Sequence, residues 1–354
     1  MSELERVARE PVPLYRRTIT GSGMAGVAAL VDAARRIIVG ALCVVAGQKV
    51  LIIASTDRLD IASALLSACR DANADATLLV LEQLQDRPHT ELHSEIRERL
   101  AWVEASVFIA SAEKGESQMR RELISRAKRC NVRHAHMVGV TMRAMNHGFC
   151  AEPRRIANVA GLLFGSLRPS SVLQVRSASG TSLIVKTGAR TRWVEHSGVI
   201  RRGRWENLPA GEIITCPLDV NGVFVADGTM SELWGCADQR LKDNPIIVEF
   251  RDGCVREVHC ANGRLARDVK EWMLSGQNYD RVGLVGLGTN VGISEPIGEV
   301  ICDQNIPGLH ISLGSTFSNE TGATWDTDDQ LLLTAFNQNV DLDGRPVIRS
   351  GRFL

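Results

Sequence analysis

The sequence has no excess of charge of either sign and no long apolar run. It contains 41 Lys and Arg residues against 41 Asp and Glu residues. Proteins that bind nucleic acid or anionic membrane surfaces carry a surplus of basic residues to meet the phosphates. The balance of charge therefore argues against both classes. The longest apolar stretch, residues 37–54, is broken by Gly40, Gly47 and Lys49 well short of a membrane span.

The sequence also lacks paired cysteine motifs and a signal peptide. Its nine cysteines are an odd number and form no CxxC motif. Cys254 and Cys260 are the closest pair, and nothing nearby completes a zinc quartet. The first seventeen residues are charged and contain no apolar core of the kind a secretory signal needs. We therefore expect reduced thiols in a cytoplasmic protein.

Hydrophobic patterning divides the 354 residues into two domains. In residues 1–169, short apolar runs alternate with segments of helical periodicity. The runs are residues 49–55, 76–81, 105–110 and 132–140, and the clearest helical segments are 57–73, 91–100 and 154–167. Strands separated by helices predict a parallel sheet covered on both faces. The first domain is therefore expected to be a Rossmann-like α/β sandwich.

From residue 170 the apolar pattern changes to a period of two. The predicted strands are residues 172–176, 181–186, 190–195, 223–228, 246–250 and 254–258, with a last hairpin at 340–348. Asp252 and Gly253 predict a tight hairpin turn between two of these strands. Residues 170–354 are therefore expected to form a β-rich α+β domain, and the whole chain is assigned to the α/β class.

Two motifs in the first domain are weak. Residues 21–26 match the GxGxxG string of dinucleotide-binding proteins, but no buried strand precedes them and no acidic residue ends a second strand at the expected distance. We therefore reject NAD binding. His134 and His136 alternate on a predicted strand and so share a face, but no third metal ligand is evident nearby.

Candidate chemistry lies in loops of the second half. Glu212 follows a Pro-x-Gly turn, His310 begins a predicted strand, and Asp326 and Asp328 belong to a short acidic turn. Carboxylates and an imidazole are the ligand types of a catalytic divalent metal. Taken alone, the same residues also suit solvated turns and an ordinary hydrogen-bonded histidine.

The order of motifs resembles the thermophilic metallo-aminopeptidase family of the aminopeptidase T and S type. The blocks that carry the resemblance are NLPAGE (207–212), LGTN (287–290) and PGLHISLG (307–314), followed by the acidic turn. The same superfamily includes the dihydroxypyridine dioxygenases, which the Gly203–Trp205 segment also resembles. The resemblance implies an α/β domain followed by a β-rich domain that carries the metal site. It also implies a homodimer.

The resemblance carries over only part of the family's metal site. Glu212 and His310 match two of its ligands. Leu284 stands where the aminopeptidases have a glutamate and the dioxygenases a histidine, and Phe317 falls near the family's tyrosine. The family's closing His-x-Asp falls on residues 326–328, so Asp326 replaces the histidine.

The resemblance therefore predicts a remodelled site with one divalent metal, either Zn, Mn, Co or Fe. Glu212, His310 and Asp328 would be ligands, and Asp326 would be a further ligand or a hydrogen-bonding partner. Glu212 and His310 are the expected catalytic residues. The leading hypothesis is a metal-dependent hydrolase resembling aminopeptidases, acting on an amide, a peptide or an amino-acid-like small molecule.

Two alternatives stay open. A mononuclear non-heme iron dioxygenase needs two histidines and one carboxylate, so His134, His136 or His196 would have to reach the site. The apolar residues Leu284 and Phe317 motivate a third hypothesis, a metal-free enzyme or a protein that binds a peptide or metabolite on the same fold.

Overall fold

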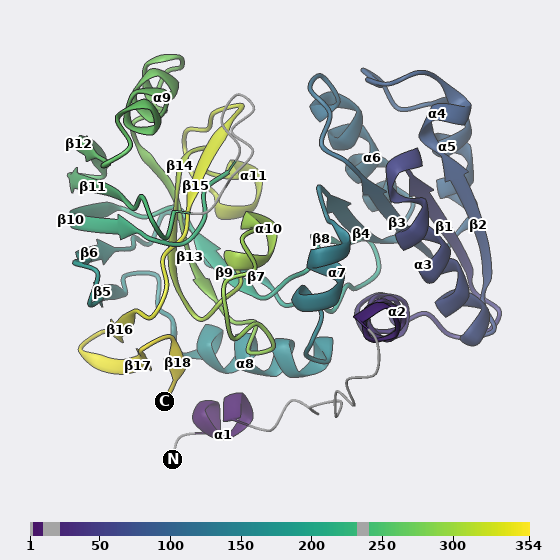
Figure 1. The fold of residues 1–354 in the computed structure, drawn as a ribbon, viewed down its shortest axis with the longest axis horizontal. Helices are drawn as coiled ribbons and strands as arrows, with labels where there is room; N and C mark the ends of the chain where they lie inside the picture. The colour runs from purple at the N-terminus through teal and green to yellow at the C-terminus, as the bar shows by residue number, and fades with distance from the viewer. Residues whose placement is uncertain (1–2, 10–21, 232–240) are drawn as a thin grey trace. The chain divides into compact units, whose positions relative to one another are not determined.

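The computed structural model describes residues 3–9, 22–231 and 241–354, and contacts divide the chain into two compact units (Figure 1). In the described residues, the first unit comprises 22–157 and 198–210, and we call it the α/β unit. The second comprises 3–9, 158–197, 211–231 and 241–354, and we call it the β unit. Gly21 of the GxGxxG string lies outside the described residues, and helix α2 begins at Ser22.

The α/β unit is built on one parallel sheet with the strand order β2-β1-β3-β4-β8. Every residue of β3 is buried, as are five of the six residues of β1. This burial confirms the expected parallel sheet covered on both faces. The strands are β1 (Lys49–Ala54), β2 (Asp75–Val80), β3 (Ala105–Ala110), β4 (Arg133–Val138) and β8 (Trp205–Asn207).

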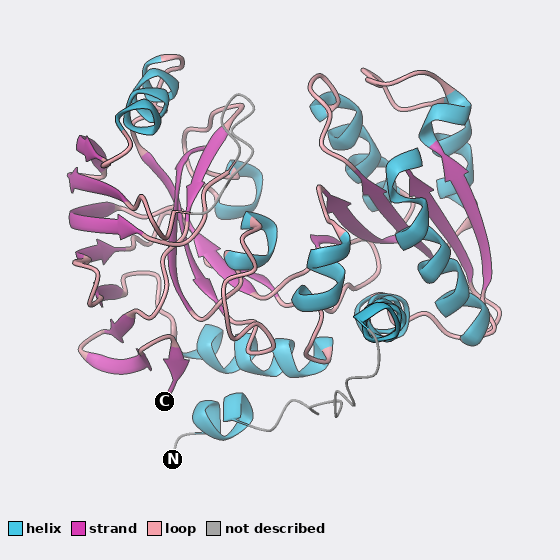
Figure 2. Cartoon of the chain, in the orientation of Figure 1, coloured by secondary structure: helices cyan, strands magenta, loops and turns pink. Residues whose placement is uncertain are grey.

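Amphipathic helices cover this sheet (Figure 2). In α3, the buried residues Ile61, Leu65 and Cys69 recur every four positions and so form one apolar face. The helices are α2 (Ser22–Arg35), α3 (Leu59–Asp71), α4 (Leu81–Leu84), α5 (Ser94–Arg99), α6 (Ser117–Arg129) and α7 (Met142–Gly148). Single turns of other helix types are η1 (Arg36–Ala41), η2 (Thr56–Arg58) and η3 (Leu100–Trp102).

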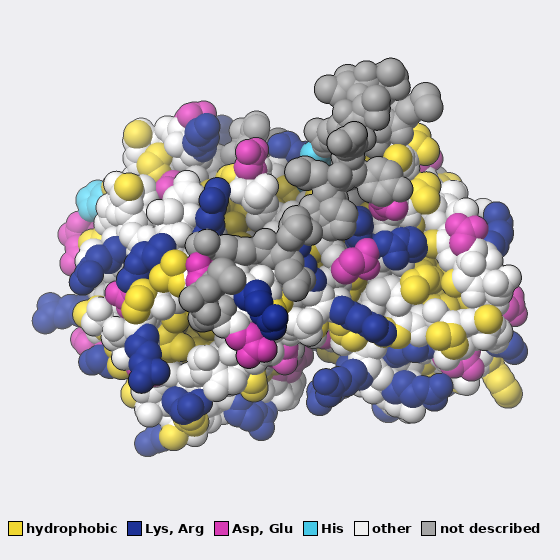
Figure 3. Space-filling view, turned by 90° about the horizontal axis from the view of Figure 1, so that it is seen from below, with side chains coloured by type: hydrophobic (Ala, Val, Ile, Leu, Met, Phe, Trp, Pro, Cys, Tyr) yellow, Lys and Arg dark blue, Asp and Glu magenta, His cyan; other side chains and the backbone are white. Residues whose placement is uncertain are grey.

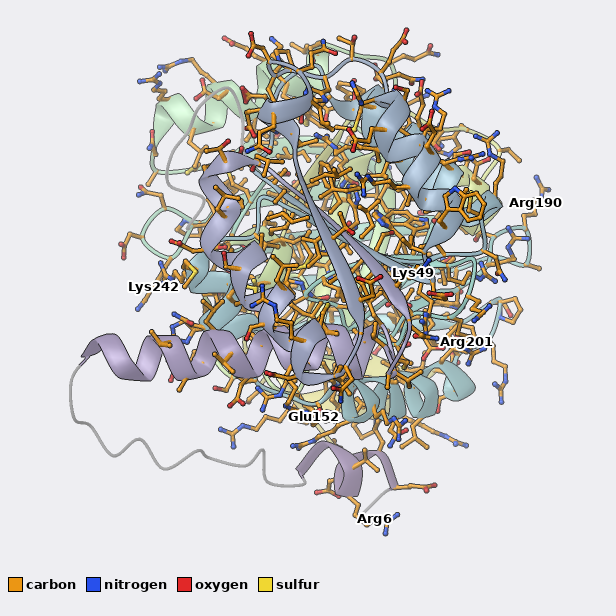
Figure 4. The ribbon with its side chains drawn as sticks, turned by 90° about the vertical axis from the view of Figure 1, so that its right-hand side faces the viewer. Arg6, Lys49, Glu152, Arg190, Arg201 and Lys242 are labelled. Carbon is orange, nitrogen blue, oxygen red and sulfur yellow. The ribbon has the colours of Figure 1, made fainter. Side chains whose placement is uncertain are left out.

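Three charged residues form ion pairs between helical segments of the α/β unit. The Glu152 carboxylate, labelled in Figure 4, pairs with Arg36 at 3.1 Å and also with Arg35. Glu152 directly precedes α8 (Pro153–Ser166), whose later residues Val159 and Leu163 belong to the core of the β unit. The chain thus passes between the units within this helix.

The β unit contains two antiparallel sheets. The larger has the order β12-β11-β10-β6-β5-β16-β17-β18 and the smaller the order β15-β14-β13-β9-β7. The larger comprises β5 (Val172–Arg176), β6 (Ser182–Lys186), β10 (Asp219–Ala226), β11 (Ile246–Arg251), β12 (Cys254–His259), β16 (Asn339–Leu342), β17 (Arg345–Arg349) and β18 (Arg352–Phe353). The smaller comprises β7 (Val194–His196), β9 (Glu212–Thr215), β13 (Val282–Gly288), β14 (Gly308–Gly314) and β15 (Gln330–Leu333).

Apolar side chains of both sheets form one core, which includes Phe224, Val248 and Ile311. The predicted hairpin between β11 and β12 is confirmed: Asp252 and Gly253 have positive φ values of 54° and 74°, as its tight turn requires. The other helices described in this unit are α1 (Glu3–Arg9), α9 (Gly263–Leu274), α10 (Val300–Asp303) and α11 (Ser318–Thr321).

The two units do not coincide with the continuous domains 1–169 and 170–354 that the sequence pattern suggests. Residues 198–210 belong to the α/β unit because β8 pairs with β4 in parallel, for example Trp205 with His134. A second difference concerns residues 190–195. Only Val194–His196 form a strand, since Arg192 is held by hydrogen bonds to α11.

The face drawn in Figure 3 shows acidic and basic side chains interspersed with hydrophobic ones. In the part of the chain that the structure describes, no helix combines the length and the apolar character needed to cross a bilayer.

Candidate functional site

The strand pairing of the smaller sheet in the β unit brings Glu212 and His310 together. Glu212 pairs with Gly288 of β13, and His310 of β14 pairs with Gly286 of the same strand. Paired residues share a face of the sheet, and positions two apart on one strand share it too. Glu212 and His310 therefore lie on one face, on either side of a central strand that carries glycines at this point.

The turn before Glu212 fixes the position of its side chain at the start of β9. Gly211 has a φ of 126°, a conformation that side chains other than glycine rarely adopt. Its N–H donates to the carbonyl of His196 at 3.1 Å, and its carbonyl accepts from the N–H of Thr289 at 2.6 Å. The Pro-x-Gly turn thus ties the start of β9 to the neighbouring strands, as needed for a rigidly placed carboxylate.

Glu212 lies between two imidazoles. Its Oε2 is 3.0 Å from Nε2 of His310, and its Oε1 is 3.6 Å from Nδ1 of His196. His196 pairs with Glu212 across β7 and β9, so it points to the same face. The amide nitrogen of Gln304, which follows α10, lies 3.4 Å from Glu212 Oε1. All three ionisable side chains are buried.

Burial alone would raise the pKa of Glu212, but hydrogen bonds and positive charge from the two imidazoles outweigh it. The pKa of the carboxyl group is thereby lowered to about 2. A carboxylate with this pKa is ionised throughout the neutral range. The site therefore contains a buried negative charge with an imidazole nitrogen near each of its two oxygens.

A second carboxylate lies behind His196. Oε2 of Glu320, in α11, is 3.3 Å from Nε2 of His196. The ring of His196 thus has a carboxylate at each nitrogen, Glu212 on one side and Glu320 on the other. We call His196, Glu212, His310 and Glu320 the Glu212 cluster.

The structure places Asp326 and Asp328 elsewhere in the β unit. Both precede β15, whose first residue, Gln330, pairs with Gly314 at the far end of β14 from His310. Gly314 is four residues from His310 along β14, and four strand residues span about 13 Å. Asp326 accepts hydrogen bonds from the backbone N–H groups of Thr316 and Ser318.

These hydrogen bonds outweigh the effect of burial and lower the pKa of Asp326 well below its ordinary value. Asp328 accepts a hydrogen bond from the hydroxyl of Tyr279 at 2.6 Å. The structure thus brings Glu212 and His310 together, whereas Asp326 and Asp328 support the loop that follows β14.

Leu284 and Phe317 supply no ligand atoms. Leu284 is buried in β13, two residues before Gly286, and pairs with Ser312. Phe317 precedes α11 in a left-handed conformation, with a φ of 47°. Neither side chain has a lone pair to offer a cation. A site with the donors for two metals is therefore not formed at these positions.

His134 and His136 belong to the α/β unit and form a separate hydrogen-bonded chain. The hydroxyl of Ser106 lies 2.8 Å from Nδ1 of His134, whose Nε2 lies 3.2 Å from Nδ1 of His136. Burial lowers the pKa of His134 to about 3 and the pKa of His136 well below its ordinary value. Both rings are therefore neutral near pH 7. Of the three histidines considered as extra ligands, His196 is the one that lies in the Glu212 cluster.

Sequence patterns do not single out Glu320 and Gln304. Glu320 belongs to a helix of four residues, and Gln304 directly follows another. For His196, the signal in the sequence is the alternation of residues 194–196, which places its side chain on one face of a strand. The strand partner of His196 could not be identified from that alternation.

The residue types of the Glu212 cluster suit one divalent cation: two imidazoles and a carboxylate are a common donor set. Two donor atoms that share a cation at about 2.1 Å lie about 3.0–3.4 Å apart, close to the contacts of Glu212. Across the described ranges, however, no three His, Cys, Asp or Glu side chains are arranged so that they could hold a metal ion. The cluster as described is therefore a hydrogen-bonded one with suitable donors.

Comparison with solved structures indicates which known fold the chain has. No family model matches the chain, and no curated protein matches it by sequence. Among solved structures it is similar to 2,5-dihydroxypyridine dioxygenase from Pseudomonas putida, with a TM-score of 0.63 and 16% identity over 92% of this chain and 96% of that one. It is also similar to AmpT from Thermus thermophilus, with a TM-score of 0.59 and 16% identity over 93% and 99% of the two chains. The chain therefore has the two-domain fold shared by the AmpT aminopeptidase and 2,5-dihydroxypyridine dioxygenase, as its sequence motifs predicted.

Proposed function

We propose that the protein is a metal-dependent enzyme whose active centre is the Glu212 cluster, with one divalent cation bound by His196, Glu212 and His310. The observation that carries the proposal is the buried, ionised carboxylate of Glu212 facing an imidazole at each oxygen. A buried charge is costly unless it is paired. In the described structure the two imidazoles pair with this charge, and a cation bound by the same three side chains would take over that role.

A single cation suits the donors better than two. Leu284 and Phe317 are apolar, and Asp326 and Asp328 are engaged in the loop beyond β14. Two cations held by one carboxylate and two imidazoles would repel each other without further negative charge. The proposed site therefore uses three protein ligands and leaves positions for water and substrate.

The proposed reaction is hydrolysis of an amide, a peptide or an amino-acid-like small molecule. A divalent cation held by His196, Glu212 and His310 would supply the activation of a water molecule and of the substrate carbonyl that this reaction needs. The chain's own residues prepare the site. Glu212 remains ionised at neutral pH, the imidazoles offer nitrogen lone pairs when they are deprotonated, and Gln304 restrains one oxygen of Glu212.

The position of His196 supports a second candidate. With His310 and Glu212 it completes the two-histidine, one-carboxylate donor set typical of non-heme iron oxygenases. The similarity to a dioxygenase in fold is consistent with this reaction but shows the fold alone. Activity that requires both Fe(II) and oxygen, and that is lost with zinc or manganese, would favour this candidate over hydrolysis.

The metal content of the full chain tests the proposal. The protein would be purified without chelators, incubated with Zn²⁺, Mn²⁺, Co²⁺ or Fe²⁺, desalted and measured by plasma mass spectrometry. His310→Ala removes a ligand, and His259→Ala is the matched control because the side chain of His259 is 65% exposed and pairs with Glu257.

We expect about one equivalent of metal in the wild type and in His259→Ala, and none in His310→Ala. Retention of the full equivalent in His310→Ala would place the cation elsewhere and contradict the proposed ligands. If the wild type binds none of the four metals, both metalloenzyme candidates fail. The remaining hypothesis is then a metal-free enzyme or binding protein.

A further inference from the structure

A groove lies at the edge of the parallel sheet where its strands begin. Lys49 is the first residue of β1, Glu104 directly precedes β3, and Asn131 and Arg202 lie shortly before β4 and β8. Because β1, β3, β4 and β8 are neighbours in the sheet, the segments before them meet at one edge. With Trp102, these residues line a cavity of about 370 Å³, a volume typical of sites for small molecules. We call it the amino-edge groove.

The amino-edge groove carries more positive than negative charge. Lys49 and Arg202 line it, and Arg133 lies nearby, with its guanidinium bonded to uncharged acceptors. Burial lowers the pKa of Arg133, and the positive charge of Arg202 lowers it further. Of the described lining residues, Glu104 carries a carboxylate, which accepts from the backbone N–H of Lys49 at 2.7 Å. In a chain whose overall charge is balanced, this edge is locally basic.

The two cations of the lining are not engaged within the chain. Across residues 3–9, 22–231 and 241–354, no ion pair or side-chain hydrogen bond involves the ammonium of Lys49 or the guanidinium of Arg202. Lys49 and Arg201, the chain neighbour of Arg202, are labelled in Figure 4. Unpaired cations that converge on a cavity favour an anionic ligand, and an arginine suits a phosphate through paired N–H donors.

Trp102 adds an aromatic surface to this charged cavity. It ends the single turn η3, and 76% of the residue is exposed. Within the described part of the chain, no other aromatic ring and no cation packs against its indole. Basic grooves that contain an exposed aromatic ring are typical of sites that stack a nucleobase and bind the adjoining phosphate.

We propose that the amino-edge groove binds a nucleoside phosphate, with the base against Trp102 and the phosphate between Lys49 and Arg202. Glu104 and Asn131 offer acceptors and donors to the hydroxyl and amino groups of such a ligand. A simple inorganic anion would leave the indole unused, and an apolar ligand would leave the cations unpaired. The inference does not depend on metal binding, because no residue of the Glu212 cluster takes part in it.

Calorimetric titration of the full chain tests the proposal. The ligands are AMP, GMP, CMP and UMP, with adenosine as the compound without phosphate and inorganic phosphate as the anion without a base. EDTA is present, so that no divalent cation can hold the phosphate elsewhere. Each titration is repeated at higher salt, which weakens contacts between exposed charges.

The variants separate the aromatic from the ionic contribution. Trp102→Ala removes the ring and Trp102→Phe keeps one, whereas the double variant Lys49→Ala, Arg202→Ala removes both cations. The matched controls lie in α9: Leu274→Ala changes an apolar residue that is 87% exposed, and Arg264→Ala removes an arginine whose side chain is 86% exposed. Urea unfolding checks that each variant is folded.

We expect at least one nucleotide to bind more tightly than adenosine and inorganic phosphate. Trp102→Ala should lower its affinity by about 5–150-fold, the usual range for loss of base stacking, and Trp102→Phe should lower it less. The double cation variant should bind the nucleotide no better than the nucleoside and should lose the dependence on salt. Both controls should bind as the wild type does.

Three outcomes would overturn the assignment. The first is that none of the four nucleotides binds with a Kd below about 1 mM. The second is that the affinity is unchanged in Trp102→Ala or in the double cation variant, which would place the ligand elsewhere. The third is that a single-stranded oligonucleotide binds through the same residues at least about tenfold more tightly than any mononucleotide, which would make the groove a nucleic-acid site.

Discussion

His310 and Gly286 are cross-strand neighbours, and the imidazole of His310 occupies the space that a side chain at Gly286 would fill. A Cβ added to Gly286 would overlap the Nε2 and Cε1 atoms of that ring. The ring is held by its own strand and by Glu212, so it has little freedom to move aside. The glycine thus makes room for the imidazole beside the carboxylate.

We predict that Gly286→Ala displaces His310 from Glu212. Overpacking of a buried site typically costs about 1–3 kcal/mol. Urea unfolding should therefore show a lower free energy of unfolding, and the metal content of the variant should fall with it. The matched control is Gly161→Ala in α8, where an added Cβ meets nothing within 4 Å.

The control should be neutral or stabilising by up to about 1 kcal/mol, because alanine is the better helix former. Gly286→Ala protein with wild-type stability and wild-type metal content would show that the ring of His310 has room to shift. It would also show that the position of the ring is not critical.

The loop after β14 gives a prediction about pH. Asp326 accepts hydrogen bonds from Ser315, Thr316 and Ser318, and its lowered pKa means that the ionised form is favoured in the folded state. Such a group adds stability above the ordinary carboxyl pKa of 3.8, and this contribution is lost as the pH falls below that value. Because the side chain is partly exposed, we expect a contribution on the order of 1 kcal/mol.

Asp326→Asn should therefore lower the free energy of unfolding near pH 7, and the difference from the wild type should shrink in acid. Its metal content should equal that of the wild type, since Asp326 lies outside the Glu212 cluster. Loss of bound metal with no loss of stability would instead make Asp326 a ligand, as the sequence resemblance implied.

Much of the fold could be predicted because apolar periodicity reports which faces of an element are buried. The runs that form β1 and β3 are almost entirely apolar and buried, whereas buried residues alternate with more exposed ones in β5 and β6. β8 could not be found in this way. It has three residues, and its place depends on pairing with a strand about 70 residues earlier in the chain.

The residues of the candidate site also differ in how far they could be predicted from the sequence. Glu212 and His310 belong to motifs with distinctive turns, so both could be named from the sequence. His196 and Glu320 come from segments without a motif, and their place depends on the pairing of β7 with β9 and on the binding of α11 by Arg192. Asp326 shows the opposite case, because an acidic turn in the sequence is a hydrogen-bonded loop in the structure.

Tyr279 gives a prediction about alkaline pH. Its hydroxyl donates to Asp328, and this hydrogen bond, with burial and the negative charge of Asp328, raises the pKa of Tyr279 to about 12. The chain has only two tyrosines, so the absorbance of tyrosinate should show a separate step near this pH. Stability from the hydrogen bond is present below the ordinary pKa of 10 and is lost as the pH rises through about 12.

Asp328→Asn should move that step toward the ordinary tyrosine pKa, and Tyr279→Phe should remove it. Asp341→Asn is the control, since Asp341 pairs with an arginine in the other sheet. A step that stays near pH 12 in Asp328→Asn would mean that burial, and not the carboxylate, sets the pKa.

The α/β unit contains a buried ion pair between Arg87 and Glu116. Nη2 and Nε of Arg87 lie 2.7 and 2.9 Å from the two carboxylate oxygens, and the side chain of Glu116 is fully buried. Burial acts against ionisation of Glu116, but the hydrogen bonds from Arg87 and from the N–H of His89 outweigh it and lower its pKa. Removing the cation leaves a buried charge without its partner. Arg87→Ala should therefore lower the free energy of unfolding by about 3–5 kcal/mol.

The double variant Arg87→Met, Glu116→Leu should be much less destabilised than Arg87→Ala, because it removes the stranded charge together with its partner. Arg99→Ala is the control, since Arg99 pairs with Glu95 on the surface and their side chains are 43% and 39% exposed. It should cost less than about 1 kcal/mol. Urea unfolding, monitored by hydrogen exchange of the amides in β1 and β3, would show that each loss of stability arises in this unit. A double variant as unstable as Arg87→Ala would show that packing around the pair, and not the unpaired carboxylate, sets the cost.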